Sequence, residues 1–108
     1  WPHDTRLQRV TEALMENPAD PRGLEEFAAE AGASARTLAR LFDRELGMNF
    51  RAWRQQRRLM ASLELLAGGA PVTSVALDLG YDSPSAFIAM FKRVLGKSPT
   101  AYLSEGTA

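Results

Sequence analysis

Residues 49–67, NFRAWRQQRRLMASLELLA, contain neither glycine nor proline and therefore predict one uninterrupted helix. At the usual rise per residue, this helix would be roughly 28 Å long. Similar sequences end the segments on either side of it, FDRELG at 42–47 and FKRVLG at 91–96. We therefore expect two similar units held apart by this helix. Its large apolar side chains recur at helical spacings, at Phe50, Trp53, Leu59, Leu63 and Leu66.

The composition is that of a globular protein, with 45% hydrophobic and 24% charged residues among 108. This length allows one compact unit, or two very small ones that share a core. No run of 18 apolar residues predicts a membrane span, and the absence of cysteine excludes disulfides and thiolate metal sites. The chain starts without methionine and without the pattern of a signal peptide. We expect a cytoplasmic protein, and a fragment whose upstream part is absent.

The charges are unevenly distributed, although the formal net charge is zero. Residues 34–58 carry seven bases and two acids, and residues 92–108 carry three bases and one acid. The blocks at 1–33 and 59–91 are acidic, with balances of −4 and −3. Such an asymmetry is an electrostatic footprint typical of nucleic-acid binding that the net charge conceals.

The remaining apolar patterns predict an all-α fold of about seven helices, because no segment alternates apolar and polar residues over the length of a strand. Asp4, Ser34 and Ser83 are the expected N-caps, since their side-chain oxygens can accept from unpaired backbone N–H groups. Besides the long helix, the expected helices are 5–16, 24–31, 35–46, 72–79, 84–95 and 100–104.

The chain resembles itself when it is shifted by 49 residues, or by 48 in its upstream part. Each copy contains a short helix, a glycine turn and a longer helix, which is the order of a helix-turn-helix. We expect two helix-turn-helix subdomains at 4–47 and 68–104, joined by a linker helix at 48–67. A small residue is expected where two helices cross closely, and glycine where the turn needs a positive φ. The matched pairs include Ala28 with Ala76, Gly32 with Gly80, Leu38 with Phe87, Phe42 with Phe91, Arg44 with Arg93, and Gly47 with Gly96.

The second copy, ALDLGYDSPSAFIAMFKRVLGKSPTAY at 76–102, resembles the DNA-binding domain of the AraC/XylS family of bacterial transcription regulators. It has the family pattern of an Ala, a Gly-aromatic pair, Ser, Phe, Phe-Lys, Gly, Ser-Pro and Tyr. The first copy, SARTLARLFDRELG at 34–47, is also close to the family form. The resemblance covers residues 4–103, which is nearly the whole chain.

The resemblance implies that a monomer inserts the second helix of each copy into successive major-groove segments on one face of DNA. It implies promoter or operator DNA as the partner, RNA polymerase as a further partner, and no cofactor. In the family, this domain usually follows an effector-binding or dimerisation domain. We therefore expect the isolated domain to be monomeric and the full-length protein to dimerise.

The resemblance also implies which side chains contact bases, and these differ chemically between the copies. Two arginines in the first copy can each donate to guanine O6 and N7, unless they form a solvated face or contact phosphates instead. The second copy has alanine at position 89, where the family often has arginine, and can offer thymine methyls only apolar contact from Ala86, Ile88 and Ala89, with one polar contact from Ser85. We therefore expect the first copy to perform most of the direct readout. The expected base contacts are Arg36, Ala39 and Arg40 in the first copy and Ser85, Ala86 and Ala89 in the second.

Further basic residues are expected to contact DNA phosphates, so that affinity should fall steeply with salt. Arg58 is expected to form an internal salt bridge instead. Trp53 and Tyr102, each six residues after a glycine that ends a helix, are expected to anchor the cores rather than stack on bases. The expected phosphate contacts are Arg51, Arg54, Lys92, Arg93 and Lys97.

Two rival functions leave more of the sequence unexplained. An enzyme is disfavoured, because the chain has one histidine, no cysteine, no glycine-rich phosphate loop and no inward carboxylate pair. We expect no catalytic residue, no cofactor, no metal and no membrane partner. A basic helical protein-interaction module without DNA readout is the alternative, since the basic start of the long helix suits an acidic partner. That alternative does not account for the duplicated motif.

Overall fold

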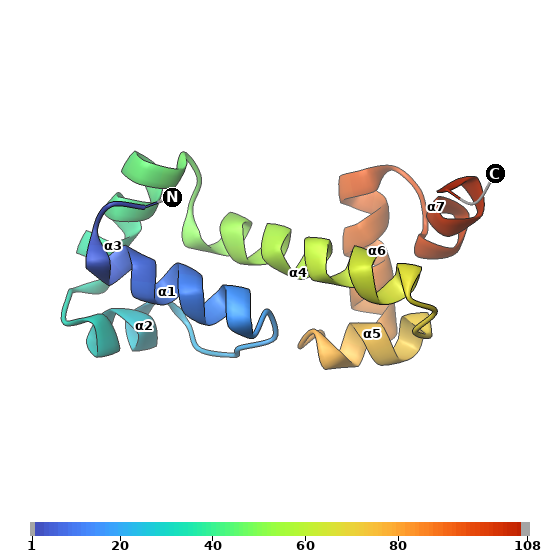
Figure 1. Ribbon diagram of the computed structural model, residues 1–108, viewed down its shortest axis with the longest axis horizontal. Coiled ribbons are helices and arrows are strands. Elements are labelled where there is room, and N and C mark those ends of the chain that lie inside the picture. The colour runs from blue at the N-terminus through green and yellow to red at the C-terminus, as the bar shows by residue number, and fades with distance from the viewer. Residues whose placement is uncertain (1, 107–108) are drawn as a thin grey trace. The chain divides into compact units, whose positions relative to one another are not determined.

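A computed structural model describes residues 2–106, which form seven α-helices and one short π-helical segment, without a strand (Figure 1). The chain divides into two compact units, Trp1–Arg57 and Arg58–Ala108. The division falls inside the long helix α4 (Phe50–Ala67), which begins in the first unit and continues into the second. The all-α class predicted from the sequence is confirmed. Within the described part of the chain, no helix is both long and apolar enough to cross a bilayer.

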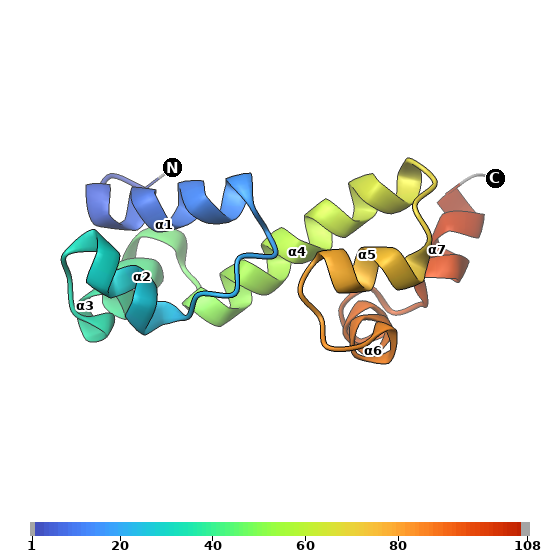
Figure 2. The same cartoon turned by 90° about the horizontal axis from the view of Figure 1, so that it is seen from below.

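The first unit contains α1 (Thr5–Glu16), α2 (Leu24–Ala31) and α3 (Ala35–Leu41), which pack against one another (Figure 2). The Asp4 carboxylate accepts from the backbone N–H of Arg6 at 2.8 Å and caps α1. The Ser34 hydroxyl accepts from the N–H of Thr37 at 3.1 Å and caps α3. Between α2 and α3, Gly32 has a φ of 76°, which an L side chain would adopt only under strain. These residues fix the tight turn of the first helix-turn-helix, as the sequence predicts.

The core of the first unit combines aliphatic residues of α1 and α3 with an aromatic cluster. The Phe27 and Phe50 rings lie 5.8 Å apart, and the Phe42 ring lies 5.6 Å from Phe50 and 6.2 Å from Trp53, all edge to face. The predicted role of Trp53 as a core anchor is therefore confirmed. The buried members are Leu7, Val10, Leu14, Phe27, Ala28, Leu38, Leu41, Phe42 and Phe50.

Helix α3 departs from the prediction of one α-helix over residues 35–46. Its last turn, η1 (Phe42–Leu46), is π-helical and ends at Gly47, whose φ is 70°. Within this wide turn, a Glu45 carboxylate oxygen accepts from the backbone N–H groups of His3 at 2.6 Å and Asp4 at 3.4 Å. These partners lie more than 40 positions earlier in the chain, so local periodicity contained no sign of them.

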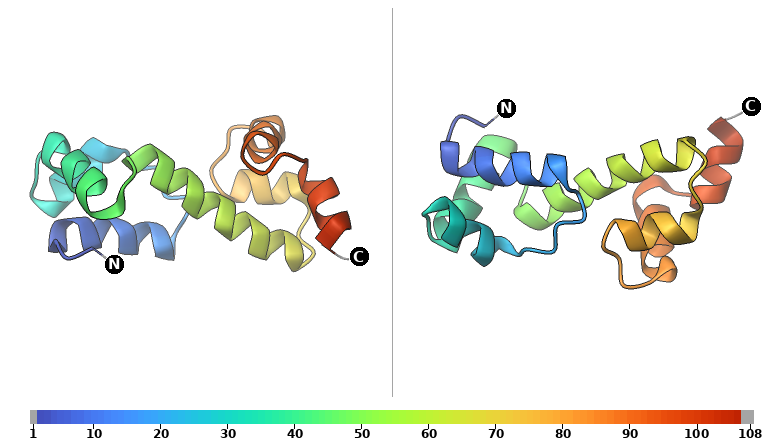
Figure 3. Two further views of the ribbon diagram at one scale, coloured as in Figure 1. Left: turned by 90° about the horizontal axis from the view of Figure 1, so that it is seen from above. Right: turned by 60° about the horizontal axis from the view of Figure 1, so that its bottom comes forward.

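The second unit contains the rest of α4 with α5 (Val72–Asp78), α6 (Pro84–Leu95) and α7 (Pro99–Gly106); α5 packs beside α6, and α7 also contacts α6 (Figure 3). The Ser83 hydroxyl accepts from the N–H of Ala86 at 3.2 Å, and Pro84 occupies the first helical position. Helix α5 ends one residue earlier than predicted. Helix α7 begins one residue earlier than predicted and extends beyond 104, with the Ser98 hydroxyl accepting from the N–H of Ala101 at 3.2 Å.

An aromatic row crosses the core of the second unit. Ring centroids are separated by 5.4 Å between Tyr81 and Phe87, 5.7 Å between Phe87 and Phe91, and 5.6 Å between Phe91 and Tyr102. The predicted role of Tyr102 as a core anchor is thus confirmed. The buried members are Leu59, Ala61, Leu66, Val75, Ala76, Leu79, Phe87, Met90 and Phe91.

Candidate nucleic-acid interface

Helix α3 has a buried face and an exposed basic face. Leu38 and Leu41 lie in the core, which turns Arg36 and Arg40 outward, and both arginines are exposed. Ala39, the other predicted base contact on this helix, is only half-buried. Within residues 2–106, neither arginine makes an ion pair or a side-chain hydrogen bond. The exposed face of α3 therefore presents two guanidiniums whose donors are available to a ligand.

The corresponding face of α6 carries small, uncharged side chains at the predicted contact positions. Phe87, Met90 and Phe91 are buried, and the predicted base contacts on this helix are exposed. Ile88, which we expected to face outward, is half-buried and packs against the second core. Ile88 is thus only partly exposed, because the apolar face of α6 extends to this position. The exposed predicted contacts are Ser85, Ala86 and Ala89.

The predicted phosphate contacts differ in their surroundings. Arg51, Lys92 and Arg93 are exposed, whereas Lys97 and Arg54 are half-buried. Arg58, for which we expected an internal salt bridge, holds its guanidinium 5.7 Å from the centroid of the Tyr81 ring, a cation–π contact. Burial raises the pKa of the Tyr81 phenol, against the opposing effect of the neighbouring Arg58 charge. Arg58 thus packs within the second unit.

Arg54 has partners in the first unit that the sequence did not indicate. Its guanidinium donates to the backbone carbonyl of Arg22 at 2.6 Å and to that of Asp20 at 3.3 Å. It also lies over the Phe50 ring, 4.6 Å from the centroid. Arg54 therefore fixes the loop between α1 and α2 to the start of α4, and it is the least exposed of the three arginines predicted to contact phosphate.

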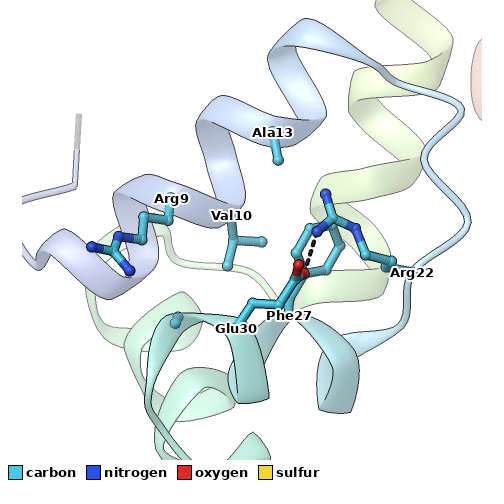
Figure 4. Close-up of a pocket in the computed structure, with 7 residues that line it drawn as sticks. Arg9, Val10, Ala13, Arg22, Phe27 and Glu30 are labelled. Carbon is cyan, nitrogen blue, oxygen red and sulfur yellow. Dashed lines mark hydrogen bonds and ion pairs between the residues drawn. The ribbon is translucent and has the colours of Figure 1, made fainter.

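A cavity of about 110 Å³ lies beside α2, and two of its lining side chains, Arg22 and Glu30, form an ion pair (Figure 4). Arg22 pairs with Asp20 at 2.6 Å and with Glu30, and it lies 4.4 Å from the centroid of the Phe27 ring. The hydrogen bond from Arg22 lowers the pKa of the Asp20 carboxyl, and the same pair raises the pKa of Arg22. The charges of Arg22 and Glu30 in this cavity are therefore already paired with each other.

Among residues 2–106, no group of three or more His, Cys, Asp or Glu side chains is arranged to hold a metal ion. The functional groups that share an exposed face are instead the guanidinium groups of Arg36 and Arg40 on α3. Sequence reasoning identified that face from the helical period and from the family resemblance.

Comparison with known proteins assigns the chain to a family. The profile of a helix-turn-helix domain matches residues 27–105. A probable AraC family transcriptional regulator from Rhodopseudomonas palustris has a similar structure, with a TM-score of 0.78 and 27% identity over 94% of this chain and 97% of that one. The chain belongs to the AraC/XylS family. The resemblance seen in the sequence is thereby confirmed.

Other members of the AraC/XylS family match over almost all of this chain. The HTH-type transcriptional regulator NimR of Escherichia coli K12 is 40% identical over 102 residues, which are 94% of this chain and 37% of NimR. The DNA-binding domain of AdpA, a global transcriptional factor solved in complex with a target DNA, has a TM-score of 0.85 and 32% identity, over 93% of this chain and 91% of that one. The chain spans about a third of the length of the first curated relatives it matches.

Proposed function

We propose that this AraC/XylS-family domain binds double-stranded DNA sequence-specifically and so regulates transcription. The exposed face of α3 carries the proposal, because Arg36 and Arg40 project there without ion-pair partners among the described residues. A guanidinium in this setting can donate two hydrogen bonds to guanine O6 and N7 in the major groove. The AdpA domain, solved with its target DNA, and the regulator NimR support the proposal.

The two recognition helices would divide the readout unequally. Helix α3 would read bases through Arg36 and Arg40, with Ala39 packing between them. Helix α6 would enter the next major-groove segment and contribute apolar contact to thymine methyls and one hydroxyl. Its proposed contacts are Ser85, Ala86 and Ala89.

Phosphate contacts would hold both helices in register without adding sequence information. The exposed cations Arg51, Lys92 and Arg93 suit this role best. Lys97 is half-buried and would reach the backbone from the turn after α6. Arg54 would contribute less, because its donors are directed at loop carbonyls.

The full-length protein would act in the cytoplasm, at promoters, together with RNA polymerase. Exposed apolar side chains in the second unit suit a protein partner, since Met60 is 58% exposed and Leu77 is 56% exposed. Because this chain matches only 37% of NimR, we propose that the domain alone is monomeric and that other parts of the full-length protein mediate dimerisation. Sedimentation of the domain and of the full-length protein tests the two oligomeric states.

An electrophoretic shift assay in a salt series tests DNA binding directly. We expect the domain to shift a selected duplex more strongly than a scrambled duplex of equal length. The logarithm of the affinity should fall linearly with the logarithm of salt, with a slope of about −0.9 for each phosphate contacted. If no duplex is shifted at low salt, the protein-interaction module becomes the better account of the basic surface.

A further inference from the structure

A second cavity, of about 210 Å³, lies beside the C-terminal half of α3 and collects three arginines. Arg6 comes from the first turn of α1, Arg40 from α3 and Arg44 from the π-helical turn η1. The hydroxyl-bearing Thr37 and the apolar Leu41 complete its lining, and no acidic side chain does so. The site is therefore a basic cleft next to the proposed base-reading face.

Most of the positive charge in this cleft is not neutralised. The Nε and Nη2 groups of Arg6 donate to the Asp4 carboxylate at 3.1 and 2.8 Å, but the Arg6 side chain remains 40% exposed and its Nη1 is not bound by Asp4. Arg40 and Arg44 are exposed and make no ion pair with any residue the structure describes. They lie four positions apart in the chain, where like charges repel. Placing these arginines together does not stabilise the free protein, so binding of an anionic ligand is the simplest explanation for the arrangement.

Hydrogen bonds between side chains and backbone groups connect the two sides of the cleft. The Glu45 carboxylate accepts from the N–H groups of His3 and Asp4, which ties η1 to the residues just before α1. The Gln8 side-chain amide donates to the carbonyl of Pro2 at 2.6 Å and fixes the same segment to α1. Glu45 is thus occupied by backbone donors and is not paired with the guanidinium of Arg44. Arg6 and Arg44 are held on neighbouring elements.

We propose that this cleft binds one DNA backbone phosphate at the edge of the major groove that α3 enters, with Arg6 and Arg44 as its ligands. Guanidinium groups match the geometry of phosphate oxygens and can bind them with two hydrogen bonds. The site rests on the proposed function, since only a helix α3 in the groove brings a phosphate to this place. Arg44 is the counterpart of Arg93 in the repeat, and its partner in the cleft, Arg6, comes from α1 of the first unit.

Salt titrations of DNA binding test the cleft with Arg44→Gln, Arg6→Gln and the double variant. The matched control is Arg9→Gln, because Arg9 is also an exposed arginine of α1 but lines the other cavity. We expect Arg44→Gln to weaken binding to the selected and scrambled duplexes by the same factor, and to reduce the salt slope by about 1. The double variant should also have its salt slope reduced by about 1 rather than 2, because both guanidiniums bind the same phosphate. Circular dichroism confirms that each variant is folded.

A duplex in which single phosphates are replaced in turn by neutral methylphosphonates locates the contact. One replacement should weaken the wild type and Arg9→Gln, but leave Arg44→Gln unchanged. The proposal is overturned if Arg44→Gln has the same slope as Arg9→Gln while the wild type binds DNA. It is also overturned if Arg44→Gln weakens only the selected duplex, because Arg44 would then read a base. Failure of the wild type to bind any duplex would instead reject the proposed function, and the cleft's assignment with it.

Discussion

The two helix-turn-helix units repeat the same internal design but present different surfaces. In both, a buried alanine lies in the first helix and a buried large residue, Leu38 or Phe87, lies in the second. On the outside, α3 presents exposed arginines, whereas the predicted contacts of α6 are one serine and two alanines. Packing constrains the buried positions of a duplicated motif, while the exposed positions are free to diverge in chemistry.

The units also differ in how the recognition helix ends. Helix α6 stays α-helical to Leu95, and Gly96 follows with a φ of 82°. Helix α3 changes to the π-helical η1, whose Glu45 binds the backbone before α1. The first unit therefore connects its recognition helix to the N-terminal segment, and no contact of this kind is found for α6 in the part of the chain that the structure describes.

The largest expected effects concern the two cores. Phe87→Ala should lower the free energy of unfolding by about 3–5 kcal/mol, and Leu38→Ala by about 2–5 kcal/mol, since both side chains are fully buried. Chemical denaturation measures these losses. Both tryptophans of the chain belong to the first unit, so tryptophan fluorescence should respond more to Leu38→Ala if the units unfold separately. Val94→Ala, at an exposed position, is the control, and a loss as small as that control's at either core site would contradict the packing described.

Arg54 and Arg51 lie on the same helix and should separate stability from DNA binding. Arg54→Ala removes charged donors from two loop carbonyls and should cost about 1.5–3 kcal/mol of unfolding free energy. Arg51 is exposed, so Arg51→Ala should change stability by less than about 0.5 kcal/mol. Thermal or urea unfolding measures both. Equal stability of the two variants would remove the structural role assigned to Arg54.

Base discrimination should distinguish α3 from α6. Arg40→Ala should reduce discrimination between the selected site and a site with the contacted guanine replaced by about 1–3 kcal/mol. Ser85→Ala should have a smaller effect, because a single hydroxyl makes one hydrogen bond. Ala89→Arg should add a guanine preference to the second half of the site. Competition binding with half-site variants measures these changes, and unchanged discrimination by Arg40→Ala would refute its role in readout.

Acid should affect the first unit more than the second, as the smallest of these effects. The hydrogen bond from Arg6 lowers the pKa of Asp4 from 3.8 to about 2. The native state thus binds a proton on Asp4 less tightly than the unfolded state, so this contribution is complete above about pH 4 and is lost as pH falls towards about 2. The hydrogen bond from Arg22 likewise lowers the pKa of Asp20. Unfolding at stepped pH should show a shallower acid loss in Asp4→Asn, whose amide can still cap α1.

Much of the fold follows from local sequence, whereas several side-chain roles do not. Helical period and capping chemistry predicted Asp4, Ser34 and Ser83 as the N-caps of α1, α3 and α6, as the structure confirms. Three features depend on partners distant in sequence or on packing across a whole helix: the π-helical turn, the anchoring by Arg54 and the partial burial of Ile88. The cleft at Arg6 and Arg44 brings together residues from different helices, so no local pattern marked it.

The central claim is that two similar units read DNA unequally, and selection of bound oligonucleotides from a random pool tests it most directly. We predict a logo with two boxes about one helical turn apart. One box should be rich in guanine and strongly specified, and Arg40→Ala protein should lose the information in that box while retaining the weaker one. A single box, or two boxes of equal strength that Arg40→Ala leaves unchanged, would contradict the claim.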